Sequence, residues 1–250
     1  MPADKLPAWL SDHLQPQNTD FDVRVVCTPD NTPWQPTGLK GVQMRIMEYV
    51  PGPIPRLSSQ LCFEQDHEPV WLDNQPDLEI LIQKGKFLSA NGSSYAANGY
   101  YRLPDRPNAA PQQLQCQGST SLSVTHPGLV YISAGQMTQS DARWRRVHTA
   151  DPAKWFPGPV EGTDVLPLHG YGSGNIMLVR WNRSAAFKTR IDPRGEELLV
   201  LDGAVHDAKG SYKQGSWIRN PITTWQAWGG TAGTVVYYKN GHFAQPTAKP

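Results

Sequence analysis

Short hydrophobic runs recur along the chain, most of them interrupted by glycine or ended by proline. Six of these runs are ILIQKGKF (80–87), YYRLP (100–104), LVYISAGQM (129–137), LVLDGAV (199–205), SWIRNP (216–221) and TVVYYKNG (234–241). Leu-rich and β-branched runs of this length favour strands, and the intervening glycines supply the positive φ that tight turns require. The pattern therefore predicts an all-β protein, with one short helix at 6–14 and a turn near 151–155.

The chain contains an internal repeat. WQPTGLKG at 34–41 matches WFPGPVEG at 155–162, and residues 78–104 match 196–221 in the same order. In the longer segment the matched pairs are Gly85 with Gly203, Gly92 with Gly210, Tyr95 with Tyr212, Gly99 with Gly215, Arg102 with Arg219 and Pro104 with Pro221. Two segments repeated in one order indicate two copies of one domain. We expect an N-terminal extension at 1–33, a first barrel at 34–145 and a second at 146–250.

Composition narrows the classes of protein. The formal net charge is +1, and the chain lacks an apolar run long enough to span a bilayer, so we expect neither nucleic-acid nor membrane binding. The N-terminus has no signal-peptide pattern, which predicts a soluble cytoplasmic protein. Three cysteines without a CxxC pair argue against a disulfide framework or a structural zinc site. Nine tryptophans need burial and argue against disorder as the cause of the high proline and glycine content.

The motif around the second copy resembles a known family. Gly195, Glu196 and Glu197 precede a Leu-Val-Leu run and Gly203, and Asp207, Gly210, Tyr212, Gly215, Arg219 and Pro221 follow at matching spacing. This pattern resembles the cupin superfamily, in particular the ChrR-like cupins. The resemblance implies a bicupin with two tandem antiparallel jelly-roll barrels, each with a pocket in its mouth. Such families include zinc-binding anti-sigma factor domains and iron-dependent dioxygenases, and the fold does not choose between them.

The metal-ligand positions implied by the resemblance are mostly changed. A cupin site uses three histidines and one glutamate, because imidazoles and a carboxylate hold a divalent ion and leave positions open. Aligned on Gly203, the glutamate falls on Glu196, and two of the histidines fall on Arg190 and Asp192. The last histidine falls on Gln226, five residues after Pro221. We therefore expect no metal.

Three interpretations of the changed positions stay open. Arg190, with Asp192 or Glu196 beside it, can grip an anionic ligand group in a bidentate pair. The same three residues can instead form an internal salt-bridge network that only holds the barrel mouth together. Asp192, Glu196 and Gln226 can also offer oxygens to Mg²⁺ or Ca²⁺, although the fixed charge of Arg190 opposes a cation there.

The first copy retains no ligand set. The aligned positions are Leu72, Asn74, Leu78 and Ala109, with Glu79 next to Leu78. Its apolar side chains favour a packed interior over an apolar ligand site.

Other motifs carry little chemistry. The seven histidines, His13, His67, His126, His148, His169, His206 and His242, show no metal-binding spacing. The glycine-rich segment 170–175 fits a turn better than a dinucleotide site, and RWRR at 143–146 fits a solvated linker.

The sequence therefore predicts a bicupin that binds a small molecule or has a regulatory role. We expect its pocket in the second barrel, a ligand that can be anionic, and no cofactor. The residues expected around this pocket are Arg190, Asp192, Glu196, Gln226, Trp217, Trp225 and Trp228. The alternative is a cupin dioxygenase that acts on dicarbonyl or hydroxyketone compounds and uses iron or zinc through histidines from outside the motif. A third class is an interaction module like the cupin part of an anti-sigma factor. Two fused barrels can bury against each other what a single-barrel cupin buries as a dimer, so a monomer stays open, whereas edge strands that pair between chains favour a homodimer.

Overall fold

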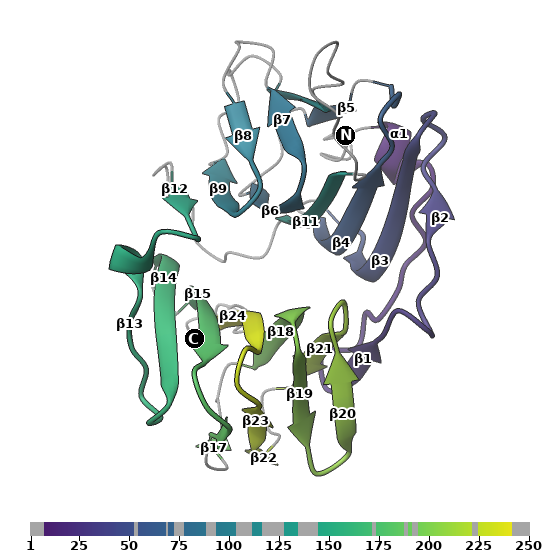
Figure 1. The fold of residues 1–250 in the computed structure, drawn as a ribbon. Helices are drawn as coiled ribbons and strands as arrows, with labels where there is room; N and C mark the ends of the chain where they lie inside the picture. Colours follow the sequence, from purple (N-terminus) through teal and green to yellow (C-terminus); the bar gives the residue numbers. More distant parts are fainter. Residues whose placement is uncertain are drawn as a thin grey trace, which may run out of the picture. The chain divides into compact units, whose positions relative to one another are not determined.

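A computed structural model describes residues 8–52, 55–68, 70–72, 78–88, 94–103, 112–116, 128–134, 145–171, 174–187, 190–191, 195–221 and 225–241. Within these ranges every strand pair is antiparallel, which confirms the all-β prediction (Figure 1). The predicted N-terminal helix is present as α1 (Ala8–Ser11), and the turn near 151–155 is the 3-10 helix η1 (Pro152–Lys154). The side chain of Asp151 caps η1 by accepting a hydrogen bond from the backbone N–H of Ala153. No helix in the described ranges is long and apolar enough to cross a membrane.

The first of two compact units contains a seven-stranded sheet, in the order β12-β9-β6-β11-β4-β3-β2, and a four-stranded sheet, in the order β5-β10-β7-β8. The bounds are β2 Gln35–Pro36, β3 Val42–Val50, β4 Arg56–Phe63, β5 Val70–Leu72, β6 Leu78–Lys84, β7 Lys86–Leu88, β8 Ser94–Ala96, β9 Gly99–Leu103, β10 Gln112–Cys116, β11 Gly128–Ala134 and β12 Arg145–His148. Its core takes alternate residues of β6, Leu78, Ile80 and Ile82, because side chains alternate between the two faces of a strand.

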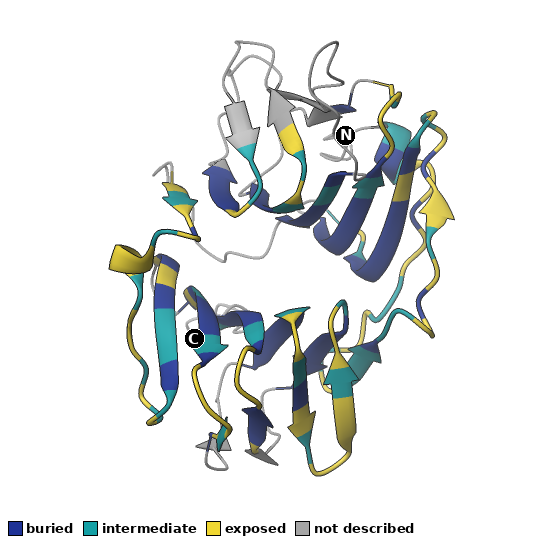
Figure 2. Ribbon diagram, in the orientation of Figure 1, coloured by how far each residue is buried: buried dark blue, intermediate teal, exposed yellow. Residues whose placement is uncertain are grey.

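The second unit repeats this plan. Its larger sheet has the order β1-β21-β18-β24-β15-β14-β13, and its smaller sheets are β16-β23-β19-β20 and β17-β22. The bounds are β1 Val25–Cys27, β13 Phe156–Pro157, β14 Thr163–Tyr171, β15 Gly174–Trp181, β16 Ala185–Ala186, β17 Arg190–Ile191, β18 Glu196–Asp202, β19 Ala204–Asp207, β20 Gly210–Lys213, β21 Trp217–Asn220, β22 Trp225–Gln226, β23 Trp228–Gly230 and β24 Val235–Asn240. Figure 2 shows that the middle strands β4 and β18 are buried along much of their length.

The two copies keep the same register at corresponding positions. In the first unit Glu79 of β6 lies opposite Arg102 of β9, and in the second Glu197 of β18 lies opposite Arg219 of β21. Trp34 and Trp155, which open the two copies, each pack under an arginine guanidinium, at 4.5 Å from Arg45 and 4.4 Å from Arg180. The sequence repeat therefore corresponds to a repeat in structure.

Two short strands, β1 and β12, each come just before one copy in the sequence but pair with a strand of the other copy. β1, which comes before the first copy, pairs with β21 of the second unit, and β12 pairs with β9 of the first. The described residues up to Thr19 group with the first unit, whereas Asp20–Thr32 groups with the second. The segment expected as one N-terminal extension is thus divided between the two units.

Candidate functional site

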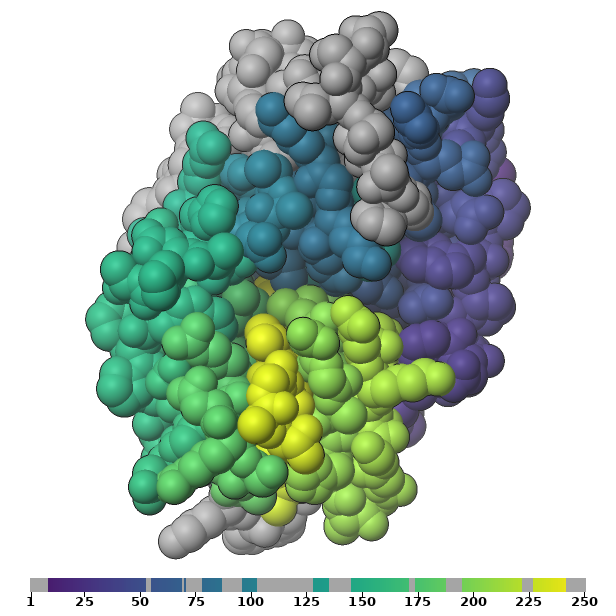
Figure 3. Space-filling model, in the orientation of Figure 1, coloured from purple at the N-terminus to yellow at the C-terminus, as the bar shows by residue number. Residues whose placement is uncertain are grey.

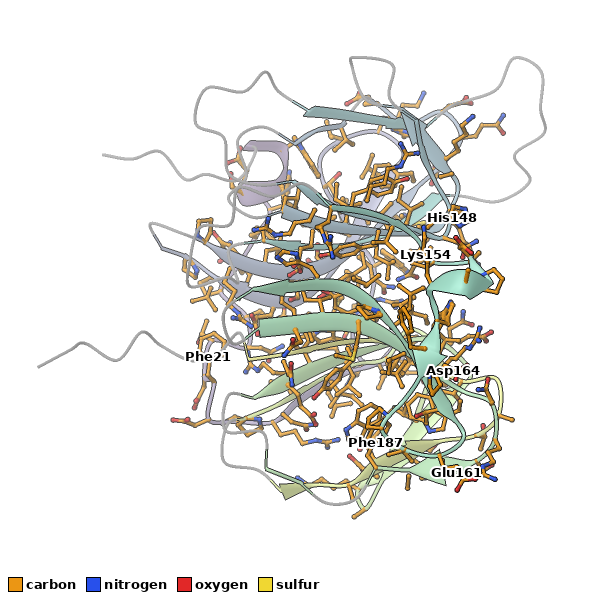
Figure 4. All side chains as sticks on the ribbon, turned by 90° about the vertical axis from the view of Figure 1, so that its left-hand side faces the viewer. Phe21, His148, Lys154, Glu161, Asp164 and Phe187 are labelled. Carbon is orange, nitrogen blue, oxygen red and sulfur yellow. The ribbon has the colours of Figure 1, made fainter. Side chains whose placement is uncertain are left out.

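Four aromatic side chains fill part of the interior of the second unit. Trp181 ends β15, Phe187 follows β16, Trp228 begins β23 and Tyr238 lies in β24, and all four are buried. We call them the aromatic cluster. Trp228 stacks on Phe187 with ring centroids 4.7 Å apart, and it also contacts Trp181 at 5.5 Å and Tyr238 at 5.7 Å. Phe187, labelled in Figure 4, meets Trp181 edge-on at 5.9 Å.

A buried carboxylate adjoins this cluster. Glu196, the first residue of β18, is 3% exposed and lies opposite Asn220 of β21. The Tyr238 hydroxyl donates to Oε2 of Glu196 over 3.0 Å, and the Asn220 amide donates from Nδ2 to Oε1 over 2.8 Å. Because both carboxylate oxygens accept hydrogen bonds, the cost of burying the group is reduced. Tyr238 therefore links the buried Glu196 carboxylate to the aromatic cluster.

Arg24 extends the hydrogen-bond network around Glu196. Its Nε donates to Oδ1 of Asn220 over 2.9 Å, and its terminal nitrogen pairs with Oδ2 of Asp207 over 2.5 Å. The Tyr212 hydroxyl donates to the other oxygen of Asp207 over 3.1 Å. Both charged side chains are largely buried, at 12% exposure for Arg24 and 7% for Asp207, so the ion pair is poorly screened by solvent. One hydrogen-bond network thus connects Glu196, Asn220, Arg24, Asp207 and Tyr212.

The structure brings two predicted site residues together through their backbones. Arg190 of β17 and Gln226 of β22 are direct partners in the sheet register, with Ile191 opposite Trp225. Their side chains, and all of Asp192, lie outside what the structure describes. The described arrangement therefore places two of the aligned ligand positions side by side in one two-stranded sheet.

Trp217 does not join this group. Its indole N–H donates to Oε1 of Glu197 over 2.7 Å, and its neighbour Ile218 is the residue that enters the second unit's core. Since alternate residues of a strand face opposite sides, Glu196 and Trp217 lie on opposite faces of the sheet. The prediction that Trp217 lines the same pocket as Glu196 is corrected on this point, whereas Trp228 contacts Tyr238, a hydrogen-bond partner of Glu196.

In the first unit the structure describes the side chains of Leu78 and of its neighbour Glu79. Leu78 lies in the core at 2% exposure, as the packed interpretation expects. Glu79 faces the other side, where it accepts a hydrogen bond from the Tyr100 hydroxyl over 3.3 Å. Burial, followed by the charge of Glu79, holds the pKa of Tyr100 well above its ordinary value. Leu72 pairs with Gln112 through its backbone, and Asn74 and Ala109 fall outside the described residues.

No group of three or more His, Cys, Asp or Glu side chains gathers within the described part of the chain. His169 is buried in β14, His67 packs edge-on against Phe63, and His148 and His206 are exposed. Among the described cysteines Cys27 is buried and Cys62 is half-buried, and burial raises the pKa of the Cys62 thiol. His126 and His242 lie outside the described ranges.

The residues at the aligned positions do not fit a cupin metal. A guanidinium stays protonated and cannot act as a ligand, and Arg190 occupies a histidine position. The one retained ligand type, Glu196, directs both oxygens at the neutral donors Asn220 and Tyr238. No metal chemistry follows from this donor set.

Sequence reasoning missed Arg24, Asn220, Tyr238 and the two other aromatic residues, Trp181 and Phe187. Arg24 lies in the segment expected to be an extension, and nothing local links it to β21. Asp207 and Tyr212 were noted as motif residues, and the structure shows what joins them: the Arg24 guanidinium bonds to both.

Comparisons with known proteins agree with this fold. Residues 144–244 match the family described as the ChrR cupin-like domain. The sequence has no match among curated proteins. Solved structures similar to this chain include protein Ylba from Escherichia coli (TM-score 0.60, 10% identity, covering 88% of this chain and 91% of that one). The bacterial pirin YhhW from E. coli, in complex with nickel(II), has a TM-score of 0.58 at 10% identity and covers 87% of this chain and 98% of that one. The 11S allergen from Cocos nucifera has a TM-score of 0.56 at 10% identity and covers 90% and 91%.

The fold and the motif together define the class. The structural likeness spans nearly the whole chain, and at this identity it establishes the fold alone. The chain has a bicupin fold, as the repeat and the motif predicted. Residues 144–244 match the family model of the ChrR cupin-like domain.

Proposed function

We propose that the protein binds a small organic molecule inside the second unit, without a metal, and that the ligand combines a planar apolar ring with an anionic acceptor group. The observation that carries the proposal is Tyr238. Its hydroxyl donates to the buried Glu196, while its ring packs on Trp228 at 5.7 Å. A carboxylate, a phenol and stacked aromatic rings therefore share one interior. Apolar walls with a few placed polar groups are typical of small-molecule sites.

A buried hydrogen-bond donor without a partner supports the proposal that the ligand carries an acceptor group. Nε1 of Trp228 is buried and has no hydrogen-bond partner among the described residues. By contrast, Nε1 of Trp181 donates to the backbone oxygen of Ala185 over 3.0 Å. An unpaired buried donor costs about 1–3 kcal/mol, which an acceptor from a ligand would recover.

The backbone pairing of Arg190 and Gln226 supports the anionic part of the proposal. Arg190 would grip a ligand carboxylate, Asp192 and Glu196 would orient the guanidinium, and Gln226 would offer a donor and an acceptor. A guanidinium in this role replaces the metal that a cupin centre would hold. The proposed site therefore needs no cofactor.

The test follows the indole N–H signal of Trp228 by NMR while benzoate is added, with benzamide as the uncharged counterpart. We expect a saturable shift with benzoate in the millimolar range, which corresponds to about 4 kcal/mol of binding free energy, and a weaker response to benzamide. The indole signal of Trp155, which packs under Arg180, serves as the internal control and should stay in place. A Trp228 signal that neither compound moves would contradict the proposal.

A further inference from the structure

A residue from before the first copy enters the interior of the second unit. β1 pairs with β21 in a register that sets Val25 opposite Arg219 and Val26 opposite Ile218. Val26 packs against the second unit's core, so Arg24, two residues earlier, lies on the same inward face, next to Asn220. β1 thus lies beside β21, and in Figure 3 dark purple atoms of the N-terminal part of the chain border green atoms of the second unit.

The contacts of Arg24 fix the orientation of the Asn220 amide. A guanidinium only donates, so the atom that Asn220 turns toward Nε of Arg24 at 2.9 Å must be its carbonyl oxygen. The amide nitrogen then faces Glu196, and it donates to Oε1 over 2.8 Å. A flipped amide would present a donor to a donor and an acceptor to a carboxylate, which is unfavourable at both ends.

The guanidinium is itself held in place. Its terminal nitrogen contacts Oδ2 of Asp207 at 2.5 Å and the Tyr212 oxygen at 3.2 Å, and the guanidinium lies 5.3 Å from the Tyr212 ring centroid. Asp207 and Tyr212 belong to the β19–β20 hairpin, whereas Asn220 belongs to β21. One planar fork therefore joins two elements of the second unit, which a lysine ammonium cannot reproduce with the same geometry.

We propose that Arg24 is a positioning residue of the second unit's site, and that this site is complete only when the segment 20–32 is in place. Arg24 acts through Asn220: it fixes the amide, and the amide fixes the Glu196 carboxylate. This inference rests on the function proposed above. It adds that residues from before the first copy control a site formed by residues from after residue 180.

The first test needs no ligand. The side-chain amide signals of Asn220, assigned by their loss in Asn220→Asp, are compared between the parent protein, Arg24→Gln, Arg24→Lys and Lys213→Ala. Lys213 is the control, because it pairs at 3.0 Å with Asp30 of the same segment through exposed side chains. We expect the Asn220 amide signals to move or broaden in both Arg24 variants and to stay unchanged in Lys213→Ala. Unchanged signals in the Arg24 variants, or equal changes in all three, would overturn the proposal.

The second test measures benzoate affinity through the Trp228 indole. Arg24→Gln and Arg24→Lys should each weaken the affinity by about tenfold, the scale of one charge-assisted hydrogen bond. Asn220→Asp keeps an acceptor for Arg24 but cannot donate to Glu196, so it should lose affinity while β1 stays paired. Affinity equal to that of the parent in these variants would overturn the inference. If benzoate fails to bind the parent itself, the proposed function fails, and the amide comparison still decides the role of Arg24.

Discussion

Trp217 donates its indole N–H to Glu197 over 2.7 Å, and both side chains are fully buried. The first unit has a weaker counterpart, in which the Tyr100 hydroxyl donates to Glu79 over 3.3 Å. The two glutamates hold equivalent positions in the repeat, opposite Arg219 and Arg102. The bicupin therefore keeps a buried aromatic donor on a buried carboxylate in each half, on the face of the sheet away from each unit's core.

We predict that Trp217→Phe destabilises the protein by about 2 kcal/mol. The change removes a hydrogen bond to a buried charged group, and such bonds contribute about 1.5–3 kcal/mol. Chemical denaturation monitored by circular dichroism measures the effect. Trp155→Phe is the control, because Trp155 is only half-buried and keeps a ring under Arg180 after the change. Equal losses in the two variants would show that the Glu197 bond contributes nothing measurable.

Asn182→Ala should raise the pKa of Asp164. Asn182 donates from Nδ2 to Oδ2 of Asp164 over 2.9 Å, and Arg180 donates to the same oxygen at 3.0 and 2.8 Å (Figure 4 labels Asp164). The hydrogen bonds from these two residues, that of Asn182 foremost, hold the Asp164 pKa below its ordinary value because they favour the ionised form. Carboxyl ¹³C NMR titration follows the change.

The sign of the linked effect on stability follows from this direction. A lowered pKa makes Asp164 stabilise the fold above its unfolded-state pKa, and this contribution is lost as the pH falls through the folded value. In Asn182→Ala the folded-state pKa lies closer to the unfolded-state value, so the contribution should be smaller and its loss should be complete at a higher pH. Arg183→Ala removes a partner of Glu161 instead, so it should leave the Asp164 titration unchanged. An Asp164 pKa that is the same in the parent and Asn182→Ala would refute the assignment.

Gly203→Ala should cost more stability than Gly233→Ala. Both glycines have positive φ, +68° and +87°, so both substitutions carry the left-handed backbone penalty of about 1–2 kcal/mol. A Cβ at Gly203 would also lie 2.7 Å from Oγ1 and 3.0 Å from Cα of Thr234, whereas a Cβ at Gly233 meets nothing within 4 Å. We expect about 1–3 kcal/mol of additional loss at Gly203, measured as the difference in unfolding free energy. A smaller loss at Gly203 than at Gly233 would contradict this packing.

The sequence was sufficient to predict the architecture because the fold depends on local patterns that occur twice. Gly85 and Gly203 both adopt positive φ after a central strand, and the alternation in 78–82 and 196–200 turns equivalent positions inward in each copy. The sequence did not allow us to predict which strands β1 and β12 pair with. Each pairs with a strand from the other copy, and a short strand carries no local signal of its distant partner.

The candidate site, too, could be predicted from the sequence only in part. Counting back from Gly203 led to Arg190 and to the buried Glu196, and counting forward from Pro221 led to Gln226, which the structure pairs with Arg190. The count could not show that Trp217 faces the opposite side from Glu196, since this depends on sheet register. Nor could it reach Arg24, whose partner Asn220 lies 196 residues along the chain.

The metal content of the protein, purified without a metal-affinity tag, tests the central claim most directly. The parent is compared with the Arg190→His, Asp192→His, Gln226→His triple variant, which with Glu196 supplies a complete cupin ligand set. Elemental analysis should find no stoichiometric iron, zinc, nickel or manganese in the parent and about one metal ion per chain in the variant. About one tightly held metal ion per chain in the parent would contradict a site that binds its ligand without a metal.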